Sequence, residues 1–333
     1  MTCRNMSFSV KQFVKTWMLV IAMVAGVSIY LIYHSLDFLH PAGGVLLKIC
    51  THVQPVMLFC MLFLTFCKTE PRQLRPHKWQ WWLLLIQAVS FTLLSLVLVI
   101  SPDFVFRVGV ECLMICMICP TATACAVVTD RLGGDMAGVL TYTILINLLT
   151  ALLVPLLVPL VRPMVGIDFV SAFNRILAKV FPLLIMPCLA AWLVRYLFPR
   201  IHKALLQYTS LSFYIWAVAL TLAILMSTRA LVKYQGSMSV LLEIIAVSIL
   251  SCAVQFWAGK KIGEYYDHKA LDTTQRYNRK ITAGQSLGQK NTVFGIWMGY
   301  TFLDPVTSLA CGFYSIWHNC YNTWQLHRAG KKL

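Results

Sequence analysis

The sequence has 333 residues, of which 59% are hydrophobic and only 12% charged, and its mean hydropathy is +0.72. A soluble domain carries about 25% charged residues, so this composition excludes an ordinary soluble protein and indicates a chain whose solvent is lipid. The net charge of +16 does not indicate nucleic-acid binding, because the basic residues cluster between apolar blocks instead of forming one stripe or tail.

Ten apolar blocks are long enough to cross a bilayer, and a crossing segment must be helical because lipid offers the backbone no hydrogen-bond partners. The first block is too long for a cleavable signal peptide. We therefore expect one integral, all-α polytopic membrane domain with ten transmembrane helices. In chain order the expected spans cover residues 14–36, 44–67, 79–101, 104–128, 136–161, 169–198, 205–228, 238–259, 281–302 and 305–325.

The distribution of lysine and arginine predicts the orientation of these spans. With the N-terminus inside, about 20 of the 28 basic residues fall on the cytoplasmic side, about seven on the outer side, and Lys290 within a span. This asymmetry favours an even number of spans, with both termini in the cytoplasm and the protein in the cell (inner) membrane. The longest polar stretch, residues 260–280, is expected to be a cytoplasmic loop.

Two spans are interrupted by polar or helix-breaking residues. In the fourth, Pro120 removes a backbone donor next to Thr121 and Thr123. In the ninth, residues 284–292 combine two glycines with six polar side chains, among them Lys290. A kink at Pro120 alone is compatible with a purely structural role. A lysine at the centre of a span costs about 2.5–3.5 kcal/mol on insertion scales, which favours a functional role for Lys290.

The two interruptions occupy the fourth position of each half if the ten spans divide as five plus five. Interrupted spans at corresponding positions are a strong sequence indication of a carrier's binding site. Five is an odd number, so two such halves would insert with opposite orientations, as inverted repeats require. The expected repeats cover about residues 1–165 and 166–333.

Twelve cysteines are present, but most lie inside apolar blocks, where cysteine behaves as a small hydrophobic residue. Cys116 and Cys119 have CxxC spacing, and their position in an apolar helical pattern favours packing over metal binding. The sequence has no histidine-rich metal box and no acid pair with a nearby histidine at membrane depth. We therefore expect a protein that is not an enzyme and has no cofactor.

Three segments of the chain resemble the bile acid:sodium symporter family, of which it would be a divergent, bacterial-type member. Residues 120–135 are similar to the family's Pro-Gly-Gly-Thr-Ala-Ser-Asn stretch and the Gly-Asp that follows. Residues 286–292, Ser-Leu-Gly-Gln-Lys-Asn-Thr, resemble its Glu-x-Gly-Met-Gln-Asn-Ser motif. Residues 316–319, Ile-Trp-His-Asn, resemble the His-Asn pair of its last span. The specific motifs cover only about 30 residues.

The resemblance implies a panel domain made of spans 1, 2, 6 and 7, and a core domain made of spans 3–5 and 8–10. The broken fourth and ninth helices would cross within the core. It implies a small organic anion as substrate, such as a bile acid-like carboxylate or sulfate, moved by alternating access. It implies substrate contacts at Thr123, Asn291, His318 and Asn319, and ion-site or coupling positions at Gln87, Cys125, Thr143, Ser286, Gln289 and Lys290.

The departures from the family pattern concern sodium. Cys125, Ala126 and Ser286 stand where the first sodium site has Ser, Asn and Glu, and they do not supply the hard oxygen ligands that sodium needs. We therefore expect this first site to be absent. At the second site, Gln87 and Gln289 are retained, but Lys290 replaces a glutamine.

Three hypotheses account for Lys290. In the first, its ammonium replaces sodium as a fixed internal cation. In the second, Lys290 exchanges a proton, because burial disfavours the charged amine. In the third, Lys290 binds a substrate carboxylate. The first two are preferred to the third. An acid beside Lys290 would help in each case, but the glutamates within spans, Glu111 and Glu243, lie toward the outer border.

Two alternative functions remain open from the sequence. Cys119 and Cys125 lie at the fourth-span interruption, and soft thiolates suit metalloids, so arsenite efflux is one alternative. Loss of the first sodium site is compatible with a non-transporting membrane sensor on the same fold. No oligomeric state follows from the sequence.

Overall fold

The computed structural model describes residues 10–208, 211–266 and 272–330. In this part of the chain the regular structure is helical, apart from one isolated bridge between two residues. Four of the basic residues used to predict the orientation, Arg4, Lys269, Lys331 and Lys332, lie outside the described residues.

Each expected span has a helical counterpart in the structure, and most boundaries agree within a few residues. Continuous helices form at six of them. These are α1 (Val10–Ser35), α2 (Gly43–Cys67), α3 (Lys78–Ile100), α6 (Met136–Val161), α10 (Leu211–Lys233) and α11 (Met238–Tyr265).

The other four expected spans are more irregular. The fourth is divided into α4 (Arg107–Ile118) and α5 (Cys125–Arg131), and the ninth into α12 (Thr273–Gly288) and α13 (Thr292–Phe302). The tenth begins with the short 3-10 turn η3 (Pro305–Thr307) and continues as α14 (Ser308–Gly330). The sixth consists of α7 (Phe169–Leu184) and α8 (Met186–Leu197), which are bent by 43° relative to each other.

Two expected boundaries were wrong. The stretch 260–280 is not simply a loop, since α11 continues to Tyr265 and α12 begins at Thr273. The seventh span starts later than expected, because the short helix α9 (Pro199–Gln207) precedes it as a separate element. The bend of the sixth span was also not predicted, although Pro182 and Pro187 lie on either side of it.

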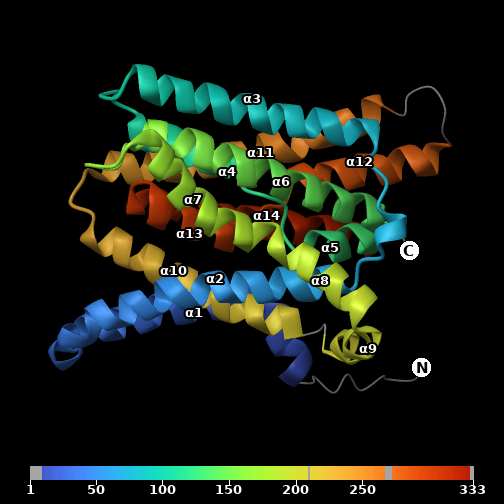
Figure 1. Cartoon of the computed structure of the whole chain (residues 1–333), viewed down its shortest axis with the longest axis horizontal. Helices are drawn as coiled ribbons and strands as arrows, with labels where there is room; N and C mark the ends of the chain where they lie inside the picture. The colour runs from blue at the N-terminus through green and yellow to red at the C-terminus, as the bar shows by residue number, and fades with distance from the viewer. Residues whose placement is uncertain (1–9, 209–210, 267–271, 331–333) are drawn as a thin grey trace, which may run out of the picture.

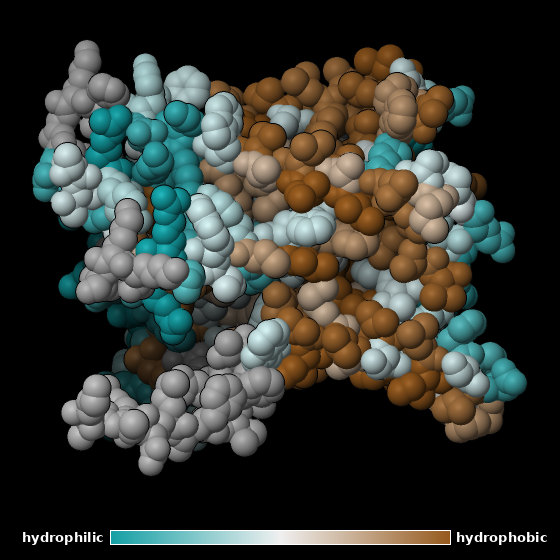
Figure 2. All heavy atoms as spheres, turned by 180° about the vertical axis from the view of Figure 1, so that it is seen from behind, coloured by the Kyte–Doolittle hydropathy of each residue, from teal (hydrophilic) through white to brown (hydrophobic). Residues whose placement is uncertain are grey.

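Six of the described helices are long and apolar enough on their own to cross a membrane, and the bent pair α7–α8 adds a seventh candidate. Large apolar side chains are exposed on their outer faces; Val24 is 59% exposed, Leu93 58% and Leu242 61%. In Figure 2, hydrophobic residues cover the middle of one face of the molecule, and hydrophilic residues gather at its two ends. This pattern is that of a polytopic protein with lipid around its middle.

The helices pack into two neighbouring groups. On one side of the molecule α1 packs against α10, α10 against α2 and α2 against α8 (Figure 1). On the other side α3, α4 and α6 pack together with α11 and α12. Helices α13 and α14 contact each other, and both also touch α10. The N-terminal end of α1 and the C-terminal end of α14 lie at the same end of the molecule (Figure 1).

Candidate functional site

The two helix interruptions lie directly against each other in the interior of the protein. Residues 119–124 and 289–291 form a short antiparallel contact, in which Thr121 and Lys290 are bridge partners. The amide of Ala122 donates to the carbonyl of Gln289 at 2.9 Å, and the amide of Asn291 to the carbonyl of Pro120 at 2.7 Å. Each interruption frees backbone groups that the other satisfies, which is how irregular backbone is tolerated at membrane depth.

The carbonyl end of α4 is the most heavily hydrogen-bonded part of this crossing. The Met117 carbonyl accepts from Gln87 Nε2 at 2.6 Å and from Lys290 Nζ at 3.3 Å. The carbonyl of Ile118 accepts from Thr150 Oγ1 at 3.0 Å. A helix C-terminus carries about half a negative charge, so the buried Lys290 ammonium lies where a cation is favoured.

The second pair of half-helices is fixed by side chains from two other segments and by a capping residue of its own. Tyr314 in α14 donates to the Gly288 carbonyl at the end of α12 at 2.8 Å. Thr121 donates to the Ser286 carbonyl at 2.8 Å. Asn291 caps α13, because its side-chain oxygen accepts from the Phe294 amide at 3.2 Å. The crossing is therefore held by side chains as well as by its own backbone.

Four buried polar atoms of the expected site residues have no hydrogen-bond partner within the described part of the protein. They are Ser286 Oγ, Gln289 Oε1, Asn291 Nδ2 and His318 Nδ1, and each of these residues is at most 4% exposed. The ring of His318 lies edge-on to Tyr314, with 5.7 Å between their centres. A buried polar group without a partner costs about 1–3 kcal/mol, so these atoms favour the presence of a polar ligand or water at the crossing.

The structure brings some of the expected site residues together and leaves others apart. Gln87, Gln289, Lys290 and Asn291 meet at the crossing, as described above. Thr123 lies in the turn between α4 and α5, and its side chain is partly exposed.

Ser286 and His318 supply two of the unpartnered atoms described above, and the other three expected positions have contacts within their own helices. Cys125 is buried at the start of α5 and points toward Thr129, with 3.9 Å between Sγ and Oγ1. Thr143 Oγ1 donates to the Val139 carbonyl at 2.8 Å, and Asn319 Nδ2 to the Ser315 carbonyl at 2.7 Å. The Asn319 side chain thus bonds within α14, and this contact gives no support to its expected role.

The partners that stabilise the crossing were not among the expected residues. Tyr142 hydrogen-bonds to Gln87, and Gln255 donates to the Cys116 carbonyl at 3.2 Å. Both residues, like Tyr314, are polar residues within otherwise apolar spans, so the sequence contains a signal that could have identified them. Their spacing alone does not show which carbonyl each would meet.

No carboxylate pairs with Lys290 among the residues that the structure describes. Its electrostatic neighbours are the thiols of Cys116, Cys119, Cys125 and Cys311. Within the described ranges, no group of three or more His, Cys, Asp or Glu residues is placed to hold a metal ion.

Glu111, one of the two glutamates within spans, has two arginine partners. It accepts from Arg107 Nε at 3.0 Å and is paired with Arg162 at 2.9 Å. The side chain of Glu243 lies against the Gly109 backbone. Both carboxylates therefore belong to contacts around the start of α4 and not to the crossing.

The fold and the crossing define a polytopic α-helical membrane protein of the kind that transports solutes, with broken helices meeting in its interior. Residues 55–235 match the model of the sodium bile acid symporter family. The match covers more than half of the chain, and the chain belongs to this family. It includes the first interruption and ends shortly after α10, before the second interruption. No curated protein matches the chain.

Proposed function

We propose that this protein is a secondary transporter of a small organic anion, that the anion binds at the crossing, and that Lys290 serves as a fixed cation in place of a sodium ion. Family membership supports transport of a small molecule across a membrane. The buried polar atoms of Ser286, Gln289, Asn291 and His318 that lack protein partners support a ligand site at the crossing.

The observation that carries the assignment for Lys290 is its hydrogen bond to the Met117 carbonyl. Lys290 is 2% exposed, and its ammonium lies at the negative end of α4, beside Gln87, which donates to the same carbonyl. A free cation at this position would compete with the ammonium for that oxygen. Since Cys125 and Ala126 offer no hard oxygen ligands from their side chains, sodium would gain little at the expected first site either.

For the architecture we propose ten spans arranged as two inverted repeats, about residues 1–165 and 166–333. The panel would contain α1, α2, α7–α8 and α10, and the core α3–α6 and α11–α14. The contacts of α1 with α10, of α10 with α2 and of α2 with α8 support this division. We also propose that both termini are cytoplasmic, consistent with the common end at which α1 begins and α14 ends.

Alternating access would then consist of the panel moving against the core around the crossing. Helices α10 and α2 both contact α13, so these contacts are where the two groups would move relative to each other. Neither metalloid efflux nor a non-transporting sensor is favoured by a separate observation in the described residues.

Uptake by the purified protein in proteoliposomes tests this proposal, with labelled taurocholate and smaller carboxylates and sulfates as probes. We expect wild-type uptake to be unchanged when external sodium is replaced by choline. Lys290→Gln removes the internal cation, and we expect uptake either to fall by about tenfold or more or to become dependent on sodium.

Lys48→Gln serves as the matched control, because Lys48 is an exposed lysine on α2, away from the crossing. It should transport like the wild type in both media. Wild-type uptake by Lys290→Gln in sodium and in choline would exclude the role assigned to Lys290. Wild-type uptake that requires sodium would contradict the loss of sodium coupling.

A further inference from the structure

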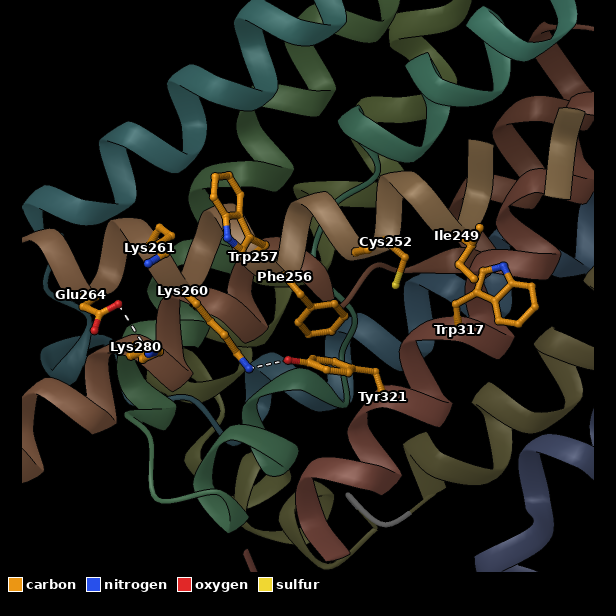
Figure 3. A pocket seen from close by; sticks show the side chains of 11 residues that line it. Ile249, Cys252, Phe256, Trp257, Lys260, Lys261, Glu264, Lys280, Trp317 and Tyr321 are labelled. Atoms are coloured by element: carbon orange, nitrogen blue, oxygen red, sulfur yellow. Dashed lines mark hydrogen bonds and ion pairs between the residues drawn. The ribbon is translucent and has the colours of Figure 1, made fainter. Parts of the chain in front are cut away.

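A groove separate from the crossing lies between α11 and α14, and it has a volume of about 480 Å³ (Figure 3). Its floor is formed by Cys252 and Phe256 of α11, and Trp317 and Tyr321 of α14 line its other side. Trp257 is 62% exposed and Ile249 43%, so the groove opens toward the outside of the helix bundle. In a membrane-spanning region, that outside is lipid.

The charged residues of the groove gather at one end. Lys260, Lys261 and Lys280 line this end together with one acid, Glu264, which leaves an excess of two positive charges. Glu264 is already paired with Lys280 at 3.4 Å and with Arg276 at 3.4 Å. In Figure 3 these side chains lie toward one end of α11, and Ile249 and Trp317 toward the other. The groove is thus cationic at one end and apolar along the rest.

Lys260 connects the two parts of the groove. Its Nζ donates to the Tyr321 hydroxyl and lies 4.8 Å from the centre of the Tyr321 ring. The methylene groups of Lys260 run past Gly284 of α12. A long aliphatic stem with a charged tip is suited to follow apolar surface and present its charge at the membrane–water boundary.

The length of the groove matches one leaflet of a bilayer. From Ile249 to Glu264, α11 advances by 15 residues, or about 22 Å at 1.5 Å per residue. Half of a bilayer of about 40–45 Å, headgroups included, measures nearly the same. A ligand that fills the groove from end to end therefore needs an anionic head and an apolar body of the length of a lipid.

We propose that this groove binds one anionic phospholipid from the leaflet at the end of the molecule where α1 begins. Its phosphate lies among Lys260, Lys261 and Lys280, and an acyl chain lies along Phe256, Cys252 and Trp317. Clusters of basic residues at this depth attract anionic lipids, which are enriched in the cytoplasmic leaflet. This inference goes beyond the proposed transport function and does not depend on the identity of the transported anion.

Native mass spectrometry of the full-length protein, with equimolar phosphatidylglycerol and phosphatidylcholine of matched chains, tests the charged end. We expect phosphatidylglycerol to be retained in preference to phosphatidylcholine. Since each lysine near a membrane surface contributes about fivefold to the binding of anionic lipid, Lys261→Gln with Lys280→Gln should reduce this preference by about tenfold or more. Lys78→Gln with Lys203→Gln, two exposed lysines outside the groove, should leave it within about twofold.

A larger side chain introduced into the apolar part of the groove tests whether an acyl chain binds there. Ala253 lines the groove. Val254, the next residue on α11, does not line it and is 54% exposed. Ala253→Trp should lower lipid retention by about fivefold or more, and Val254→Trp should leave it unchanged. A phosphatidylglycerol preference that survives both the lysine substitutions and Ala253→Trp would overturn the proposal. Displacement by millimolar inorganic phosphate as efficient as by lipid would show a simple anion site instead. Because lipid retention is measured without transport, failure here is distinguishable from failure of the transport proposal.

Discussion

Gly259→Ala is expected to destabilise the protein by about 1–3 kcal/mol, the usual cost of forcing extra atoms into a packed interior. Gly259 lies where α11 contacts α12, and a Cβ atom there would meet the Ala283 carbonyl oxygen at 2.5 Å and Gly284 Cα at 2.9 Å. Both are backbone atoms, so only a displacement of one helix from the other relieves the contact. Gly263, one turn further, is similarly close to the Arg279 carbonyl at 2.6 Å.

Thermal unfolding in detergent measures this effect, and Gly44→Ala is its matched control. A Cβ atom at Gly44 meets no atom within 4 Å, and this residue also lies in a helix, α2. Because alanine is the better helix former, Gly44→Ala should be neutral or slightly stabilising. If both variants unfold at the same temperature, the close approach of α11 and α12 is not as tight as the structure has it.

Glu111→Gln is expected to cost about 3 kcal/mol of stability. Removing one partner of a buried ion pair typically costs about 3–5 kcal/mol, because the remaining charge loses its compensation. The lower value applies here, since Arg107 and Arg162 are 20% and 35% exposed and water screens part of their charge. Arg162 also lies 3.7 Å from Asp304, so this network joins the start of α4, the end of α6 and the turn before α14.

The same unfolding measurement checks this prediction, with Asp103→Asn as the control. Asp103 is an exposed acid in the segment before α4. We expect its unfolding temperature to remain at the wild-type value, and that of Glu111→Gln to fall by several degrees. High salt should weaken the effect of Glu111→Gln only slightly, because the Glu111 carboxylate is fully buried. An unfolding temperature of Glu111→Gln equal to that of Asp103→Asn would contradict the importance of this network.

Most helix positions could be predicted from the sequence because most apolar runs are long enough to cross a bilayer. The two interruptions could also be predicted, since Pro120 and the polar residues 284–292 stand out within apolar surroundings. The pattern Gly-x-x-x-Gly at residues 259–263, typical of close helix packing, was equally present in the sequence.

The partners within the site could not be predicted in the same way. Tyr314 and Gly288 are 26 residues apart and Gln87 and Met117 are 30 apart, and such pairs depend on how helices rotate and tilt. A hydrophobic run determines that a helix crosses the membrane, but not which face it turns to its neighbours. Asn319 was assigned to the substrate by resemblance alone, and in the structure its side chain donates to the Ser315 carbonyl of its own helix.

The two backbone hydrogen bonds at the crossing have a mechanical consequence. These bonds connect Ala122 with Gln289 and Asn291 with Pro120. They therefore hold together the two interruptions, at which the inner ends of α4, α5, α12 and α13 lie. Moving any one of these half-helices alone would break bonds that have no replacement in lipid. In the alternating access that we propose, the crossing would therefore move as one rigid unit, and the relative movement would occur at the contacts of α13 with α2 and α10.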